Sequence, residues 1–354
     1  MKIVVTAGGT MGHINPALAI IDEFKKREKE LEILYIGTHN RMEKDIIPKK
    51  GIPYESIEIY GFSKNIISNI KNFFLVQKAY KKCLKILSEF KPDIVIGVGG
   101  YVTYPVLKAA HKLHLKTFIH EQNSIPGKSN LMISKYADIV GITFESSASY
   151  FKHGKVINTG NPCGVYATRM PEIDKKTIGL HQEKKLVTFA AGSLGSGSLN
   201  DKMISFLKDF DDDYEIVYIT GKNHYDSFPK NMPNKVKVLP YLEDLPKLLK
   251  VSDVIVSRAG SGSLCEILAL KKCSIVIPSP NVANNHQYLN AKELYDKGCI
   301  ELIEEKNITE DILREKINEL LNDSPKREKL INNMSKENTL ESGSIIYNAI
   351  KGLL

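Results

Sequence analysis

Residues 254–266 decide the fold of this chain, and they read VIVSRAGSGSLCE. Three apolar, β-branched residues predict a buried strand, and a glycine- and serine-rich turn then leads into a helical run. A strand that enters a helix through such a turn is typical of parallel α/β sheets. The backbone N–H groups and the positive dipole end at a helix start favour an anion. We therefore expect this turn to bind a phosphate group.

The same strand-to-helix pattern recurs along the chain and predicts two Rossmann-like domains. Residues 3–12 and 186–195 resemble each other, since each has an apolar strand that enters a loop of small residues. At 354 residues the chain exceeds what one core usually supports. We expect domains at 1–158 and 159–339, with a hinge near 159–162 and a C-terminal helix, 340–354, that packs back on the first domain. The predicted strands are 3–6, 33–36, 94–98, 117–119, 139–142, 186–189, 216–219, 236–239, 254–256 and 274–277.

Composition and charge indicate a cytoplasmic protein with a polyanionic partner. No apolar run approaches the ~20 residues that span a bilayer, and Met1 leads directly into a predicted strand rather than a signal peptide. The five cysteines lack metal-ligand spacing, which favours free thiols. Residues 1–158 carry 23 Lys and Arg against 14 Asp and Glu, a net +9, whereas the remainder, with 26 against 27, carries −1. The excess predicts that the first half meets nucleic acid or an anionic membrane surface.

The segment from Lys64 to Lys91 favours the membrane. It holds seven lysines against one acid, Glu89, and no nucleic-acid motif accompanies the lysines. A helix that carries apolar side chains within a ring of lysines can lie on an anionic bilayer, although core packing could also use these side chains. The residues expected to meet the membrane are Ile66, Ile67, Ile70, Phe73, Phe74 and Tyr80.

Two glycine-rich loops and one polar strand end mark a second site in the first half. Residues 7–13 and 97–103 both follow predicted strands, and a helix is expected to begin near Pro16 in the first case. His13 could act as a general base or as a hydrogen-bond donor to a phosphate, or it could be satisfied by a local carbonyl. Residues 120–123, His-Glu-Gln-Asn, end another strand, where ligands bind in parallel sheets.

Two acidic features each have a functional and a structural interpretation. Glu266 could accept hydrogen bonds from the ribose of a nucleotide, or it could close a capping box with Ser263. Asp211, Asp212 and Asp213 could hold a divalent metal, but a solvated turn is favoured. A polar cluster at 284–290 follows the next strand after the glycine–serine turn, and together the two segments suggest a nucleotide-sugar site.

These motifs together resemble the MurG family of bacterial transferases. The resemblance covers both halves and rests on residues 8–13, 99–102, 120–123 with Gly127 and Asn130, 160–162, 257–260, Glu266 and 285–287. It implies an α/β fold of GT-B architecture, with two Rossmann-like domains whose parallel sheets face each other across a cleft. It also implies inverting transfer of N-acetylglucosamine from UDP-N-acetylglucosamine to undecaprenyl-pyrophosphoryl-N-acetylmuramyl-pentapeptide, at the cytoplasmic face of the cell membrane, with no cofactor and no catalytic metal.

The resemblance also assigns roles to individual residues. His13 is the leading candidate for the base, and Glu266 is expected to hold the ribose. The donor-binding residues implied are Thr10, Gly12, Asn123, Ser193, Tyr241, Leu242, Arg258, Gly260, Ser261, Gly262, Ser263, Glu266, His286 and Gln287. The acceptor-binding residues implied are Gly9, Thr10, His13, Gly99, Gly100, Tyr101, His120, Glu121 and Asn123.

Two positions depart from the family pattern. Gly164 stands where the family usually has Arg, and Leu194 where it usually has Gln. We expect weaker donor binding, and tighter UDP binding in Gly164→Arg. The alternatives are a related transferase with another lipid acceptor, a non-catalytic UDP-sugar-binding scaffold at the membrane, and a UDP-N-acetylglucosamine 2-epimerase, against which the lysine-ringed segment argues.

Overall fold

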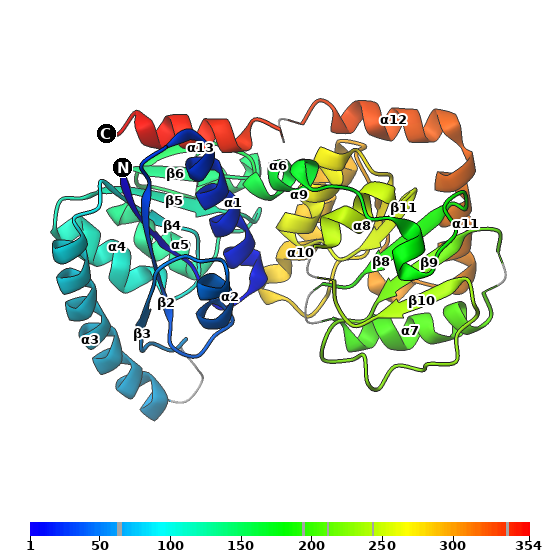
Figure 1. Ribbon diagram of the computed structural model, residues 1–354, viewed down its shortest axis with the longest axis horizontal. Helices are drawn as coiled ribbons and strands as arrows, with labels where there is room; N and C mark the ends of the chain where they lie inside the picture. Colours follow the sequence, from blue (N-terminus) through cyan, green and yellow to red (C-terminus); the bar gives the residue numbers. More distant parts are fainter. Residues whose placement is uncertain (62–65, 193–194, 211, 243, 338–339) are drawn as a thin grey trace. The chain divides into compact units, whose positions relative to one another are not determined.

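The computed structural model describes the chain except residues 62–65, 193–194, 211, 243 and 338–339, together with the side chains of 66–68, 70 and 71. It divides into two compact units. The first consists of residues 1–162 and 341–354, and the second of residues 163–340. Each unit is a parallel sheet covered by helices (Figure 1).

The first unit has a seven-stranded sheet in the order β3-β2-β1-β4-β5-β6-β7. Its strands are β1 (Lys2–Thr6), β2 (Glu32–Thr38), β3 (Tyr54–Ile57), β4 (Ile94–Gly97), β5 (Lys116–Glu121), β6 (Ile139–Ile142) and β7 (Lys155–Asn158). Its helices are α1 (Met11–Arg27), α2 (Glu43–Lys49), α3 (Ile66–Phe90), α4 (Thr103–Lys112), α5 (Lys128–Ile133) and α13 (Ser342–Lys351), with 3₁₀ turns η1 (Ser134–Tyr136) and η2 (Glu145–Tyr150).

Alternate side chains of the strands fill two cores, one on each face of this sheet. Ile3 and Val5 pack with α1, α2 and α13, whereas Val4 packs with α3 and α4 on the other face (Figure 1). Helix α1 offers an apolar stripe to its core, because Ile14 and Phe24 lie on the same side and are fully buried. Pro16 lies inside α1 and not at its start, so the helix begins five residues earlier than expected.

The second unit has a six-stranded sheet in the order β10-β9-β8-β11-β12-β13. Its strands are β8 (Leu186–Ala190), β9 (Glu215–Ile219), β10 (Val236–Leu239), β11 (Val254–Ser257), β12 (Ser274–Val276) and β13 (Glu301–Leu302). Its helices are α6 (Pro162–Arg169), α7 (Gly197–Lys208), α8 (Leu245–Val251), α9 (Ser261–Leu270), α10 (His286–Asp296), α11 (Glu310–Asn322) and α12 (Ser324–Met334), with 3₁₀ turns η3 (Lys175–Ile178), η4 (Ala283–Asn285) and η5 (Glu305–Asn307).

Three strands were not expected from the sequence, namely β3, β7 and β13. All three are edge strands, and most of their side chains are only partly buried. These three edge strands have a neighbour on one side only, and their sequences lack the continuous apolar run that marks a central parallel strand. The fourth edge strand, β10, was expected because three of its four residues are apolar.

Candidate functional site

The turn after β11 has the geometry of an anion site. β11 ends at Ser257, and α9 begins at Ser261 with Gly260 as its N-cap residue. The N–H of Leu264 donates to the Gly260 carbonyl, so residues 261–263 form the first turn, whose amides point out of the helix end. Because the helix begins at Ser261, Ser263 is not its N-cap, and the capping-box interpretation of Glu266 is wrong.

Glu266 lies in the second turn of α9 and is half-buried. Burial raises the pKa of its carboxyl group to about 8. At neutral pH the group is therefore mostly protonated in the protein without ligand, and it can both donate and accept hydrogen bonds. A carboxyl group of this kind beside an anion-binding helix end is suited to the paired hydroxyls of a ribose.

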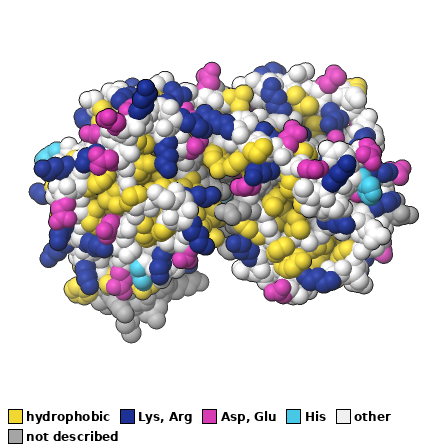
Figure 2. Space-filling view, viewed as in Figure 1, with side chains coloured by type: hydrophobic (Ala, Val, Ile, Leu, Met, Phe, Trp, Pro, Cys, Tyr) yellow, Lys and Arg dark blue, Asp and Glu magenta, His cyan; other side chains and the backbone are white. Residues whose placement is uncertain are grey.

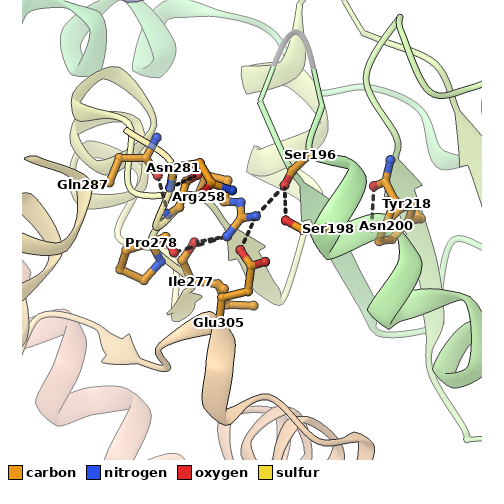
Figure 3. Close-up of polar contacts among 11 residues, drawn as sticks. Ser196, Ser198, Asn200, Tyr218, Arg258, Ile277, Pro278, Asn281, Gln287 and Glu305 are labelled. Carbon is orange, nitrogen blue, oxygen red and sulfur yellow. Dashed lines mark hydrogen bonds and ion pairs between the residues drawn. The ribbon is translucent and has the colours of Figure 1, made fainter. Parts of the chain in front are cut away.

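The side chain of Arg258 is held by hydrogen bonds and an ion pair within the protein. Its guanidinium donates to the Ile277 and Pro278 carbonyls at 3.1 and 3.2 Å and to the Ser196 hydroxyl, and it forms an ion pair with Glu305 at 2.6 Å (Figure 3). The side chains of Arg258 and Glu305 are 6% and 8% exposed. Arg258 is therefore not positioned to contact a diphosphate directly. Its side chain instead joins three loops of the second unit. Sequence analysis did not identify Glu305.

The loop after β12 carries the next group of expected donor residues. The Gln287 side-chain oxygen accepts a hydrogen bond from the Ser279 N–H at 2.8 Å, and the His286 Nδ1 lies 2.8 Å from the Ala283 carbonyl oxygen. Asn284 and Asn285 both have left-handed backbone angles, which turn the chain sharply into α10. The Asn290 amide reaches back to the Ala259 carbonyl in the turn after β11. The structure thus joins the two segments that sequence analysis linked.

A pocket of ≈ 210 Å³ lies beside this loop. It opens next to the buried Arg258–Glu305 pair, since Glu305 is part of its wall. Its lining consists of Lys202, Pro278, Ser279, Pro280, Asn285, Tyr288, Glu304, Glu305 and Lys306.

Tyr241 and Leu242 follow β10, and both are half-buried. The Lys222 ammonium lies 4.3 Å from the centre of the Tyr241 ring, so a cation already covers one face of this aromatic side chain. Leu242 packs at the edge of the core beneath α8. Ser193, also expected at the donor site, lies outside the described residues, as does Leu194.

The surroundings of Gly164 leave no room for the arginine that the family usually has at this position. A Cβ at this residue would lie 2.8 Å from the Cys265 carbonyl oxygen and 3.0 Å from the Ala269 Cβ, both on α9. A side chain here meets the backbone of the helix whose N-terminus forms the candidate anion site. The expectation that Gly164→Arg tightens UDP binding is therefore corrected, because the substitution displaces α9.

In the first unit, the loops after β1 and β4 are in direct contact. The Gly8 N–H donates to the Gly99 carbonyl at 3.2 Å. A Cβ at Gly100 would lie 2.4 Å from the Gly8 carbonyl oxygen, and Gly100 also has a positive φ of 89°. Only glycine fits this approach. The structure therefore brings together two of the loops expected to bind the acceptor.

A buried carboxylate, missed in the sequence, holds the first of these loops. Glu43 of α2 is fully buried and accepts hydrogen bonds from the Gly9 N–H at 3.1 Å and from the Thr38 N–H and hydroxyl at 3.1 and 2.6 Å. The Gly9 amide is thus already paired. The nearest signal in the sequence is a charged residue shortly after a predicted strand, which does not distinguish Glu43 from solvated neighbours.

His13 lies in the first turn of α1 and is partly exposed. Its Nδ1 is 3.2 Å from the Gln122 side-chain oxygen. Burial lowers the pKa of the ring below 6.5, whereas the negative charges of Glu121 and Glu43 and the hydrogen bonds with Gln122 and the Val98 carbonyl oppose this shift. A ring that is neutral at pH 7 can accept a proton from a substrate.

His120 and Glu121 are buried among protein partners. His120 is 0% exposed, its Nε2 lies 2.9 Å from the Gly160 carbonyl, and burial lowers its pKa to about 4. The Glu121 carboxylate is 1% exposed and accepts from the Asn123 and Gly127 N–H groups and from the Asn130 amide. His120 and Glu121 were expected to contact the acceptor directly. We correct this expectation, because both side chains are buried and stabilise the loop through hydrogen bonds to other protein groups. Asn123 is half-buried beside Glu121.

Three other expected site residues are accessible at the same loops. Thr10 and Gly12 are exposed, with Thr10 as the N-cap residue of α1. Tyr101 is half-buried, and its hydroxyl accepts a hydrogen bond from the Arg41 guanidinium at 3.2 Å. Arg41 thereby places a positive charge beside the loop after β4.

Helix α3 exposes part of the segment expected to meet a membrane. Phe73 and Phe74 are 58% and 68% exposed and pack against each other, with ring centres 6.0 Å apart. Tyr80 differs from expectation, because it packs at the edge of the core and its ring lies beneath the Lys108 ammonium. The side chains of Ile66, Ile67 and Ile70 lie outside the described residues. Within the described chain, no helix combines the length and apolar character needed to cross a bilayer.

Charge is dispersed on the face of the molecule that Figure 2 draws. Lys and Arg side chains there alternate with Asp and Glu and do not gather in one large basic area (Figure 2). Among the acidic residues considered as metal ligands, Asp212 forms an ion pair with Arg314, and Asp211 lies outside the described residues. Across the residues with described positions, no three His, Cys, Asp or Glu side chains gather as a metal site.

Comparison with known proteins defines the class first. Residues 3–142 match the glycosyltransferase family 28 N-terminal domain, and residues 186–348 match the glycosyltransferase family 28 C-terminal domain. The chain is therefore a hexosyltransferase of GT-B fold. It is 43% identical to the UDP-N-acetylglucosamine–N-acetylmuramyl-(pentapeptide) pyrophosphoryl-undecaprenol N-acetylglucosamine transferase of Bacillus cytotoxicus, over 91% of this chain and 90% of the relative. The chain belongs to this family of N-acetylglucosamine transferases, the MurG family.

Solved structures share the fold. MurG of Acinetobacter baumannii is 24% identical and covers 99% of both chains with a TM-score of 0.73. A UDP-GlcNAc 2-epimerase from Neisseria meningitidis is 16% identical and covers 99% of this chain and 100% of its own, with a TM-score of 0.68. The epimerase likeness is one of fold alone.

Proposed function

We propose that the chain transfers N-acetylglucosamine from UDP-N-acetylglucosamine to the 4-hydroxyl of undecaprenyl-pyrophosphoryl-N-acetylmuramyl-pentapeptide, with inversion at the anomeric carbon. Similarity to transferases of this name over nine-tenths of the chain supports the reaction. The observation that carries the donor site is the glycine- and serine-rich N-terminal turn of α9, where Gly262 and Ser263 are half-buried, with Glu266 one turn behind it.

The donor is held by the second unit. The first-turn amides of α9 stabilise the diphosphate, Glu266 bonds the ribose hydroxyls, and backbone groups near Leu242 meet the uracil. His286 and Gln287 contact the sugar. Arg258 acts through the loops that it joins, since its guanidinium is already paired with Glu305. As UDP leaves, the helix dipole and backbone N–H groups offset the developing charge, an electrostatic contribution of several kcal/mol in such sites.

The acceptor is held by the loops of the first unit that contain Thr10, Gly99 and Tyr101. His13 removes the proton from the attacking hydroxyl, which its lowered pKa permits at neutral pH. Phe73 and Phe74 on α3 enter the headgroup region of an anionic membrane at the cytoplasmic face of the cell membrane, where the lipid-linked acceptor lies. No cofactor or catalytic metal takes part in this scheme.

Transfer of radiolabelled N-acetylglucosamine to lipid-linked muramyl-pentapeptide in detergent, with a chelator present, tests the proposal. We expect product from the wild type and little from Glu266→Ala, with Glu315→Ala, an exposed acid on α11 of the same unit, as the matched control. UDP binding without this product, together with glycosylation of another lipid, would show that the other lipid is the acceptor. Binding without transfer to any lipid would indicate a UDP-sugar-binding scaffold.

A further inference from the structure

A chain of hydrogen bonds runs through the first unit from a backbone carbonyl to the ring of His13. The Gly160 carbonyl contacts His120 Nε2 at 2.9 Å, and His120 Nδ1 contacts the Gln122 side-chain nitrogen at 3.1 Å. The Gln122 side-chain oxygen then contacts His13 Nδ1 at 3.2 Å. Gln122 and His120 are 2% and 0% exposed, so bulk water does not compete for these contacts.

Carbonyl groups determine which atom donates and which accepts in every hydrogen bond of this series. A carbonyl oxygen only accepts, so the Gly160 carbonyl requires a hydrogen on His120 Nε2. His120 is neutral at working pH, because burial lowers its pKa to about 4, and its Nδ1 is therefore an acceptor. That acceptor faces the Gln122 amide nitrogen, as expected for a donor.

The orientation of the Gln122 amide is fixed independently. Its nitrogen lies 3.0 Å from the Val98 carbonyl and 3.1 Å from the His120 carbonyl. If the amide were rotated by 180°, its oxygen would face two carbonyl oxygens, which cannot donate. The amide oxygen must therefore face His13, and it can only accept.

We propose that Gln122, supported by His120, is a positioning residue that holds neutral His13 in the Nδ1–H tautomer, so that Nε2 carries the lone pair that removes the acceptor proton. The catalytic consequence rests on the proposed transfer reaction. The tautomer itself does not, because it follows from contacts within the protein. Gly99 supports the same arrangement, since a Cβ there would lie 2.5 Å from His13 Nδ1 and push the ring away from Gln122.

The first test reads the tautomer directly, without any reaction. The ¹⁵N imidazole spectrum of the full-length protein at pH 8 distinguishes Nδ1–H from Nε2–H rings, and the signals that vanish in His13→Gln belong to His13. We expect the Nδ1–H form in the wild type and a mixture with the Nε2–H form in Gln122→Leu. An Nε2–H ring in the wild type, or an unchanged ring in Gln122→Leu, would overturn the proposal.

Thr117→Val is the matched control. Thr117 is a buried residue at the other end of β5, and its hydroxyl bonds the Tyr136 carbonyl at 2.8 Å and the Asp138 carboxylate at 2.9 Å. The variant loses buried hydrogen bonds in the same strand, but it should leave the His13 spectrum and the pH profile as in the wild type.

The second test uses the reaction and separates positioning from general damage. We expect kcat to fall by roughly 10-fold or more in Gln122→Leu, with less effect on KM, and no further fall when Gln122→Leu is added to His13→Ala. The groups facing the ring are Glu121, Glu43, Gln122 and the Val98 carbonyl. Because the Gln122 bond raises the His13 pKa, its loss should move the acid limb of kcat/KM to lower pH.

Simple loosening of the site would have the opposite effect on pH dependence. Water would reach the ring, the burial that lowers its pKa would weaken, and the acid limb would move up towards 6.5. An upward shift, or an additive loss in the double variant, would therefore contradict a positioning role. Absence of transfer in the wild type would remove the proposed reaction but leave the tautomer measurement standing.

Discussion

Arg258 and Glu305 form an ion pair at 2.6 Å, and each side chain is less than a tenth exposed. The pair ties the turn after β11 to the 3₁₀ turn η5 after β13, and Arg258 also holds the carbonyls of Ile277 and Pro278 that precede the Gln287 loop (Figure 3). The charge of Arg258, beside the candidate donor site, is thus neutralised by another group of the protein.

Removal of one partner should be costly. We expect Glu305→Ala to lower the free energy of unfolding by about 3–5 kcal/mol, because Arg258 would remain buried without a counter-charge. Urea unfolding measures this. Glu304→Ala is the control, since Glu304 pairs with Lys306 at the surface, where such pairs contribute at most about 1 kcal/mol. Equal losses in the two variants would show that the buried pair contributes no more to the free energy of unfolding than the surface pair does.

Stability should depend on pH through Glu266. Burial raises its pKa from 4.5 to about 8, so the folded state binds the proton more tightly than the unfolded state. The resulting stabilisation is complete below pH 4.5 and is lost as pH rises through about 8. Glu266→Gln lacks this titration, so the wild type should lose stability relative to Glu266→Gln between pH 5 and 9. Parallel curves by urea unfolding would show that the carboxyl group titrates normally.

Substitution of Gly164 should destabilise the second unit. In Gly164→Ala the added Cβ lies 2.8 Å from the Cys265 carbonyl oxygen, and we expect a loss of about 1–3 kcal/mol in unfolding free energy. Gly262→Ala in α9 is the control for stability alone, because its Cβ meets only Cys163 Sγ at 3.8 Å, an ordinary contact. UDP binding that tightens in Gly164→Arg would restore the view that this position lacks a cation.

Membrane binding should depend on Phe73 and Phe74 but not on Tyr80. Replacement of both phenylalanines by serine should reduce binding to anionic phospholipid vesicles at least about 10-fold, with little change in stability, because both rings are exposed. Tyr80→Ser should instead lower stability, because this ring packs at the core edge. Vesicle co-sedimentation and thermal unfolding separate the two effects, and unchanged sedimentation of the double variant would remove α3 from the membrane interface.

The central strands and the glycine turns could be predicted because their signals are local. Val254 to Val256 are apolar and β-branched, and they form a central strand that is buried on both faces. Gly100 is required by the backbone of its own loop and of the adjacent one. The edge strands β3, β7 and β13 could not be predicted, because half-exposed residues carry no continuous apolar pattern.

The polar partners inside each unit could not be predicted, because sequence gives residue types and not the groups that they meet. Glu43, Gln122 and Glu305 are ordinary polar residues in the chain, yet each is buried against a loop of a candidate site. For His120 and Arg258 the error is the opposite one. Their residue types suggested contact with a substrate, but in the structure their side chains bind other groups of the protein.

The sequence by itself determined that two Rossmann-like units follow each other, that a helix begins in the glycine- and serine-rich turn after β11, and that His13 follows a glycine-rich loop. These features depend on neighbours along the chain, through strand propensity, backbone freedom and the helix dipole. Only the tertiary structure decided which nitrogen of His13 is paired and which carboxylate neutralises Arg258, because hydrogen bonds and ion pairs act over a few ångströms between groups that folding alone brings together.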